Sequence, residues 1–352
     1  MKNSNELVEL LKRHELIRNI NLNNSEELIS PWYIKILMGF CGWLAAIFSL
    51  GFLGMGIESL FDSPIGLSVL GVLMIGGSFT ILSSSKSEFV EHLGLAVSFA
   101  GQALIGFALF SSGKSEELFS WLVLTLMCCF LAFLMPSYIH RMMSAYFATL
   151  CLSYFMFLGE ISSFFSSIVL FFVALMWLNE FTFSHQVRKL QSVAYGAVFG
   201  LIQFKISILF ARHGQSWVQD SLPIVNQWID EGLNVLVLLY ILHQLIKHKK
   251  ILLDAPQKRL GLAVVLLLCI GTFFANGIVS GILVIIIGFA IQNKILLALG
   301  IMSAILNLSS YYYLLDISLL NKSFILGGLG CAGLILAHMS KRISDLRTHH
   351  EN

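Results

Sequence analysis

Five charged residues lie inside or at the ends of long apolar stretches, and these are the residues of this chain that could do chemistry. They are Lys205, Asp230, Glu231, Glu58 and Glu160. Charged groups are costly in the hydrocarbon core of a membrane and usually face the interior of a helix bundle. The five could form an acidic vestibule that faces outward, with Lys205 as its internal counter-charge. The alternative, which is the commoner arrangement, is that Lys205 extends its amine outward to the headgroups and the acids are merely solvated.

Motifs for nucleotide binding are incomplete or wrongly placed. The run Gly113-Lys114-Ser115 is similar to the end of a phosphate-binding loop, but Ala108 occupies the position of the required glycine. The pattern Gly328-x-Gly330-x-x-Gly333 matches a dinucleotide motif, yet it lies inside an apolar stretch with no strand before it. Close helix packing explains this pattern better, and it also explains the small-residue motifs at 196–200 and 277–281.

Metal and redox motifs are also missing from the sequence. The six cysteines have no CxxC spacing, and the histidines form no HExxH motif. His140 and four other histidines fall near the cytoplasmic ends of apolar stretches, where we expect them to be solvated. Glu91 and His92 are adjacent and would point to different faces of a helix, so they make a poor acid–base pair. We therefore expect no catalytic residue, no metal or other cofactor, and no nucleotide or nucleic-acid ligand.

Amides and one tryptophan complete the polar and aromatic residues that lie deep in the apolar stretches. We expect interhelical hydrogen bonds from the amides and packing of Trp43 between helices. The amides are Gln102, Gln203, Asn276 and Asn307.

Twelve apolar stretches position all of these residues. Hydrophobic residues make up 57% of the chain and charged residues 12%, against roughly a quarter charged in a soluble domain. About 20 apolar residues can cross a membrane, and they must do so as a helix because lipid offers the backbone no hydrogen-bond partner. The sequence therefore predicts an all-α, polytopic transmembrane helix bundle. The stretches are 32–57, 64–83, 89–110, 119–135, 142–158, 161–178, 190–209, 228–246, 260–275, 278–292, 295–314 and 323–338. The pair within 260–292 could be two thin spans or a re-entrant hairpin.

The distribution of basic residues predicts the orientation. If the N-terminus is cytoplasmic and the spans alternate, 18 lysines and arginines lie on the cytoplasmic side and 3 lie outside, namely Lys114, Arg212 and Lys322. Basic residues are retained in the cytoplasm, so both termini are expected there. Aromatic residues at the span ends agree, with Trp32, Tyr33 and Trp177 inside and Trp121, Trp228 and Tyr311–Tyr313 outside.

The same map gives the depth of Lys205. It falls about 16 residues, or roughly 23 Å, into the seventh span, which places it in the outer third of the hydrocarbon core. Asp230 and Glu231 begin the eighth span at a similar height.

The chain divides into three parts. Residues 1–30 are polar and could form a short amphipathic cytoplasmic helix, which either covers apolar surface or docks a partner; the first is our expectation. Residues 31–340 form the transmembrane bundle, and residues 341–352 form a polar cytoplasmic tail.

Residues 31–54 carry a family resemblance. The run 31–35 (Pro-Trp-Tyr-Ile-Lys), then Gly39, the run 42–45 (Gly-Trp-Leu-Ala) and the run 51–54 (Gly-Phe-Leu-Gly) resemble a bacterial family of polytopic membrane proteins, the domain of unknown function 4401 type. Genes of that family often lie beside genes for membrane-anchored proteins with a GDYXXLXY motif. The resemblance implies a bacterial inner membrane and a partner of this kind, and it supplies no catalytic residues.

Three classes of function remain. Membrane transport of a permease-like kind fits the many spans and the polar groups at membrane depth. A structural or assembly subunit, paired with a GDYXXLXY-type protein or with a second copy, fits the absence of motifs. An intramembrane enzyme ranks last. The ranking of transport first rests on architecture alone.

Overall fold

The computed structural model describes residues 32–56, 63–84, 87–111, 117–178, 186–213, 227–248 and 278–314, with short pieces between 318 and 338. These residues form helices joined by short connections, and no strand occurs among them. The helices are α2 (Trp32–Gly56), α4 (Pro64–Ser84), α5 (Glu88–Ser111), α6 (Glu117–Leu134), α7 (Tyr138–Leu158), the 3₁₀ turn η1 (Ser162–Phe164), α8 (Phe165–Leu178), α9 (Val187–His213), α11 (Gln227–His248), α13 (Ile278–Ala290) and α14 (Lys294–Leu314).

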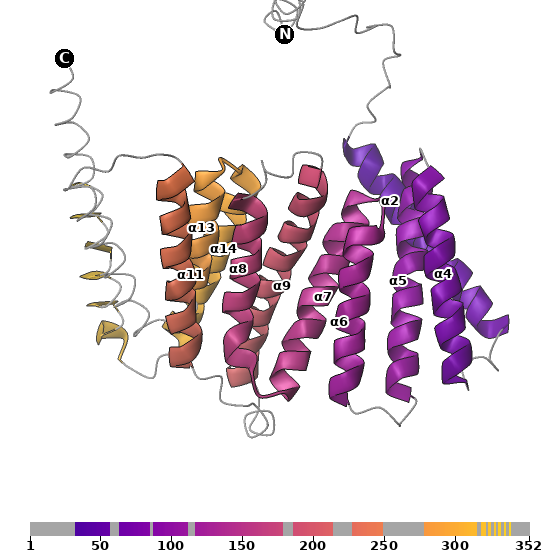
Figure 1. Cartoon of the computed structure of the whole chain (residues 1–352), viewed down its shortest axis with the longest axis horizontal. Coiled ribbons are helices and arrows are strands. Elements are labelled where there is room, and N and C mark those ends of the chain that lie inside the picture. Colours follow the sequence, from indigo (N-terminus) through magenta and orange to yellow (C-terminus); the bar gives the residue numbers. More distant parts are fainter. Residues whose placement is uncertain are drawn as a thin grey trace, which may run out of the picture.

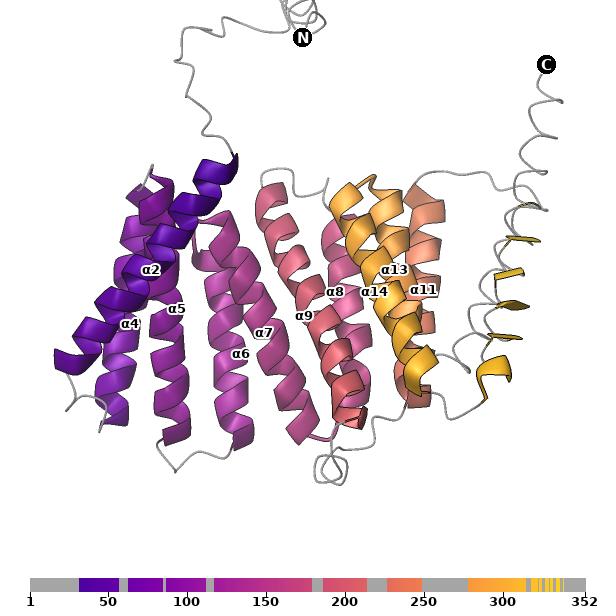
Figure 2. The same cartoon turned by 180° about the vertical axis from the view of Figure 1, so that it is seen from behind.

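The helices from α4 to α11 stand side by side, α2 lies tilted across α5 and α4, and α13 and α14 pack behind α8, α9 and α11 in the view of Figure 1 (Figures 1 and 2). Every predicted stretch from 32 to 246, and those at 278–292 and 295–314, coincides with a described helix. The prediction of an all-helical chain is confirmed for the described residues. Stretch 260–275 and the N-terminal segment lie outside them, and stretch 323–338 is described only in pieces.

Among the described residues, four helices are long and apolar enough to cross a membrane by their length and composition, namely α4, α5, α6 and α7. Large apolar side chains point outward: Ile65 is 77% exposed, Phe48 74% and Phe289 76%. Exposed apolar surface of this extent is unusual for a soluble protein and suits a lipid-facing surface. Both features support a membrane protein.

Small residues bring several helix pairs into direct backbone contact. A methyl group on Gly71 of α4 would lie 2.7 Å from the carbonyl oxygen of Gly101 in α5. A methyl group on Gly196 of α9 would lie 2.1 Å from the carbonyl oxygen of Met142 in α7. The packing predicted for the motif 196–200 is therefore confirmed. At Gly328 an added methyl group would meet no atom of the described residues within 4 Å, so the packing expected there does not occur in that part of the chain.

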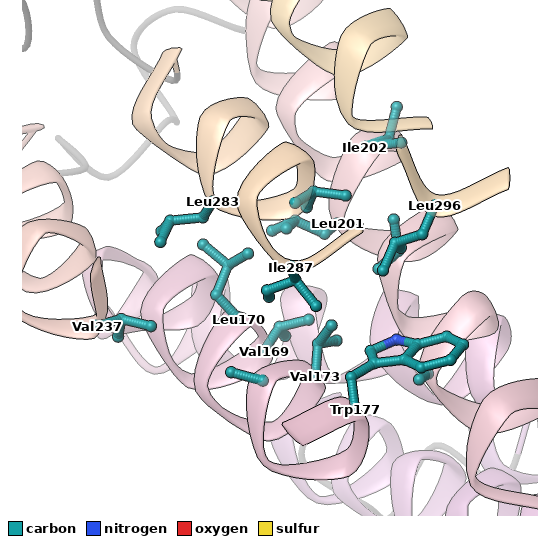
Figure 3. Packing of buried hydrophobic residues seen from close by; sticks show 14 of the residues in the cluster. Val169, Leu170, Val173, Trp177, Leu201, Ile202, Val237, Leu283, Ile287 and Leu296 are labelled. Carbon is teal, nitrogen blue, oxygen red and sulfur yellow. The ribbon is translucent and has the colours of Figure 1, made fainter. Parts of the chain in front are cut away.

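The largest apolar core surrounds α8. Val169, Leu170 and Val173 of α8 pack against Leu283 and Ile287 of α13 and against residues of α9, α11 and α14 (Figure 3). This core holds the helices that carry the predicted site in a fixed arrangement.

Trp177 lies elsewhere than predicted, whereas Trp43 packs against a neighbouring helix. Trp177 belongs to the apolar core, is only 2% exposed and meets the ring of Tyr195 edge-on, so it is not a headgroup residue. Trp43, expected to pack between helices, stacks on Phe99 of α5, with 41% of the residue still exposed. Hydropathy gives the depth of a residue and not the direction in which its side chain points, which explains the error at Trp177.

Candidate functional site

Lys205 and Asp230 form a buried ion pair. Lys205 Nζ donates to Asp230 Oδ2 at 2.7 Å, and the two side chains are 10% and 9% exposed. Lys205 lies in the second half of α9, whereas Asp230 lies in the first turn of α11. The two helices run in opposite directions, so these positions reach the same end of the bundle (Figure 1). The expectation that Lys205 extends outward to the headgroups is therefore wrong, because its amine is bound inside the bundle.

The start of α8 supplies a hydroxyl group to this pair. α8 packs against both α9 and α11, and Ser166 in its first turn donates to Asp230 Oδ1. Asn234 Nδ2 lies 3.1 Å from Ser166 Oγ and 3.4 Å from Asp230 Oδ1. Ser166 and Asn234 are both completely buried. One ammonium, one hydroxyl and one amide therefore surround the carboxylate.

The backbone of α11 adds a further stabilising effect. The N-terminus of a helix carries a partial positive charge from its unpaired amide groups, which favours a carboxylate in the first turn. A buried charge is tolerated when it is both paired and hydrogen-bonded. Asp230 meets both conditions, so the arrangement can hold a negative charge at this depth.

A small cavity lies on the α14 side of Lys205. Its volume is about 10 Å³, and its polar lining comes from Lys205, Ser303 and Asn307. This space is sufficient for about one water molecule. Asn307 Nδ2 donates to the Ser303 carbonyl oxygen of its own helix at 2.8 Å, and the interhelical bond expected of Asn307 does not occur among the described residues. Its amide instead lines the space beside the ammonium.

The other predicted members of the vestibule are placed differently. Glu231 is buried, with 5% exposed, next to Asp230 in α11. Glu160 lies in the exposed turn between α7 and η1, with a positive φ of 59°, and is not part of the ion pair. Glu58 lies outside the described residues. The structure thus brings together Lys205 and Asp230, with Glu231 adjacent in the chain.

Sequence reasoning missed Ser166 and Asn234. A signal was present for Asn234, because it follows Asp230 by four residues and so shares its helix face. The signal for Ser166 was weaker, since it is one of four serines at 162, 163, 166 and 167. All four are buried.

The other three amides that were predicted to lie deep in the spans differ in their surroundings. Gln102 Oε1 accepts a hydrogen bond from Cys128 Sγ of α6 at 3.8 Å. Gln203, in contrast, is exposed on the surface of the bundle. Asn276 lies outside the described residues.

A second polar cluster lies at the opposite end of the bundle, where α7 begins. His140 is completely buried, with Nε2 at 2.7 Å from Ser98 Oγ and Nδ1 at 3.1 Å from Ser144 Oγ. Ser137 donates to Glu91 Oε1 at 2.7 Å. The expectation that His140 is solvated is wrong. Each ring nitrogen bonds a hydroxyl, an arrangement that fixes the ring and joins α5 to α7.

Helix α2 docks on this second cluster. The ring of Trp43 stacks on Phe99 with centroids 6.1 Å apart, and Phe99 stacks on His140 at 5.1 Å. The three rings, from α2, α5 and α7, therefore stack one on the next. Among the described residues, no group of three histidine, cysteine or acidic side chains is arranged to hold a metal ion.

Comparison with known proteins gives one match. A family model described as a domain of unknown function (DUF4401) matches residues 31–343. No curated protein and no solved structure matches the chain.

Proposed function

The chain belongs to the DUF4401 family, and from that premise we propose that it is a multi-pass protein of the bacterial cytoplasmic membrane that carries out proton-linked transport. The site is the Lys205–Asp230 pair. The full bundle has twelve spans with both termini in the cytoplasm. The 18-to-3 asymmetry of basic residues supports this orientation.

The observation that carries the proposal is the buried ion pair itself. Ionisable residues inside a membrane bundle are costly and mark ion or proton pathways by default. The cavity beside Lys205 has space for about one water molecule, which can relay a proton to the pair. Protonation of Asp230 would remove the counter-charge of Lys205. The two helices would then lose their electrostatic link, which couples proton uptake to a rearrangement of α9 against α11.

Proton flux into liposomes tests the proposal. Purified protein is reconstituted with an internal pH-sensitive dye, and a membrane potential is imposed with potassium and valinomycin. We expect faster acidification than in protein-free liposomes, and loss of this excess in Asp230→Asn and Lys205→Met. Glu160→Gln is the control, because Glu160 is exposed and outside the ion pair. A wild-type rate equal to that of empty liposomes would contradict the proposal.

A second candidate function is a structural subunit of a membrane complex. The observation in its favour is the size of the cavity beside Lys205, which at about 10 Å³ is too small for any solute. The resemblance suggests a GDYXXLXY-type protein as the partner, or a second copy of the chain. Purification in a mild detergent would then yield a stoichiometric partner. A stable monomer after deletion of residues 1–28, combined with proton flux, would favour transport.

A further inference from the structure

An apolar groove lies between α6, α7, α8 and α9. Its volume is about 260 Å³. Much of this space is open because the side chains of Ala132, Ala145 and Ala148 are small. Phe133 and Phe172 also line the groove and are 51% and 55% exposed. The groove therefore opens at these two rings toward the outside of the bundle, where the apolar surface faces lipid.

The groove extends from the middle of α7 toward the end of the bundle where α7 and α9 begin. The last residues of α6 before Leu134 line the groove, and so does Val193 in the second turn of α9. The basic-residue map places this end on the cytoplasmic side. The groove therefore extends from the middle of the membrane into the inner leaflet.

Two cations lie one helical turn before residues that line this groove. Arg141 precedes Ala145 by four residues on α7, and Lys189 precedes Val193 by four residues on α9. Residues four apart share a helix face, and their side chains lean toward the N-terminus. Arg141 and Lys189 therefore lie on the helix faces that line the groove, displaced toward the inner surface.

The parallel course of α7 and α9 brings these two faces together. Gly196 contacts Met142, and Gly200 contacts Thr149 one to two turns further along both helices. The contacts advance in the same direction on the two helices, so their N-terminal ends point to the same membrane surface.

The burial and the hydrogen bonding of Arg141 indicate which ligand the groove binds. Arg141 is only 9% exposed, and among the described residues its Nε atom has no hydrogen-bond partner. A buried guanidinium nitrogen without a partner is costly, and the planar donors of arginine match the oxygens of a phosphate. Basic pockets between membrane helices on the cytoplasmic side bind anionic headgroups.

We propose that the groove holds one acyl chain of an anionic phospholipid of the inner leaflet, with its phosphate bound by Arg141 and Lys189. The acyl chain fills the apolar space between the alanines. The phosphate completes the hydrogen bonding of Arg141. This site is separate from the Lys205–Asp230 pair, which lies at the opposite end of the bundle.

Native mass spectrometry of delipidated protein tests the headgroup. The probes are phosphatidylglycerol and phosphatidylcholine with identical acyl chains. A cation near the membrane surface contributes about fivefold to the binding of an anionic lipid, so we expect phosphatidylglycerol to bind at least about fivefold more tightly than phosphatidylcholine. Arg141→Gln should reduce this preference by about fivefold. Lys294→Gln is the matched control, because Lys294 is exposed at the start of α14, away from the groove.

Filling the groove tests the acyl chain. Ala148→Phe, and the smaller change Ala148→Leu, should weaken the binding of both lipids to a similar extent and leave the headgroup preference unchanged. Ala103→Phe is the control, because Ala103 is exposed on α5. Melting temperatures without lipid establish that each variant is folded. Ala148→Leu and Arg141→Gln carry the test if Ala148→Phe does not fold.

Three results would overturn the proposal. The first is equal binding of the two lipids by the wild type. The second is an equal loss of preference in Lys294→Gln and Arg141→Gln. The third is competition by soluble glycerol 3-phosphate at the affinity of phosphatidylglycerol, which would identify a phosphate site without an acyl-chain site.

Discussion

Gly42 of α2 lies so close to His92 of α5 that a methyl group on Gly42 would come within 2.8 Å of the His92 Cβ atom and 3.0 Å of the Phe89 carbonyl oxygen. Gly39, one turn earlier, faces the imidazole ring of the same histidine. Both glycines belong to the segment that carries the family resemblance. This part of the segment therefore has a packing role, because it sets α2 directly on the backbone of α5.

Substitution of Gly42 should displace α2. We expect Gly42→Val to lower the stability by about 1–3 kcal/mol, because the added side chain has no space against α5. Thermal unfolding in detergent measures the effect. Gly51→Val is the matched control, since a methyl group at Gly51 meets no atom within 4 Å. Equal losses in the two variants would contradict the docking of α2 at Gly42.

The contact between α7 and α9 should be the most sensitive to added volume. A methyl group on Gly196 would lie 2.1 Å from the Met142 carbonyl oxygen, and a backbone atom cannot move aside as a flexible side chain can. We expect Gly196→Ala to cost about 2 kcal/mol or more. The comparison is Gly76→Ala, where a methyl group would meet open space. A Gly196→Ala protein with the melting temperature of the parent would refute the close contact.

The hydrogen bonds of His140 should contribute to stability. Ser98→Ala leaves the buried Nε2 atom without its partner, and an unmet buried polar group costs about 1–3 kcal/mol. Ser83→Ala serves as the control, because exposed Ser83 donates only to Phe79 of its own helix. Melting temperatures of the two variants would be compared. A loss in Ser83→Ala as large as that in Ser98→Ala would show that the His140 bond adds nothing.

The predicted orientation can be tested in intact cells. In a background without the six native cysteines, single cysteines are placed at Lys250 and Arg212. A membrane-impermeant thiol reagent should label position 212 and not position 250, because the basic asymmetry places Arg212 outside. The reverse pattern would require the whole map to be inverted.

Helix positions could be predicted from the sequence because each apolar stretch is long enough to form a single helix. The stretches 64–83 and 295–314 coincide with α4 and α14 to within one residue at either end. Depth could also be predicted, because each helical residue advances the chain by a fixed rise. Lys205 and Asp230 were assigned similar heights on that basis, and they are in contact.

Side-chain direction and long-range partners could not be predicted in the same way. Glu160 lies at the end of α7 and yet is outside the ion pair, because residue counting gives no rotation about the helix axis. His140 is held by Ser98, 42 residues earlier in the chain. Only the packing of α5 on α7 brings that hydroxyl to the ring, so the position of His140 near a helix end suggested a solvated residue.

The central claim is that Lys205 and Asp230 compensate each other's charge inside the bundle, and a double-mutant cycle on unfolding in detergent tests it most directly. Lys205→Met or Asp230→Asn alone leaves one buried charge without its partner, which costs roughly 3–5 kcal/mol for a buried pair. The double variant removes both charges, so we predict a loss clearly smaller than the sum of the two single losses. Additive losses, or a Lys205→Met protein as stable as the parent, would contradict the claim.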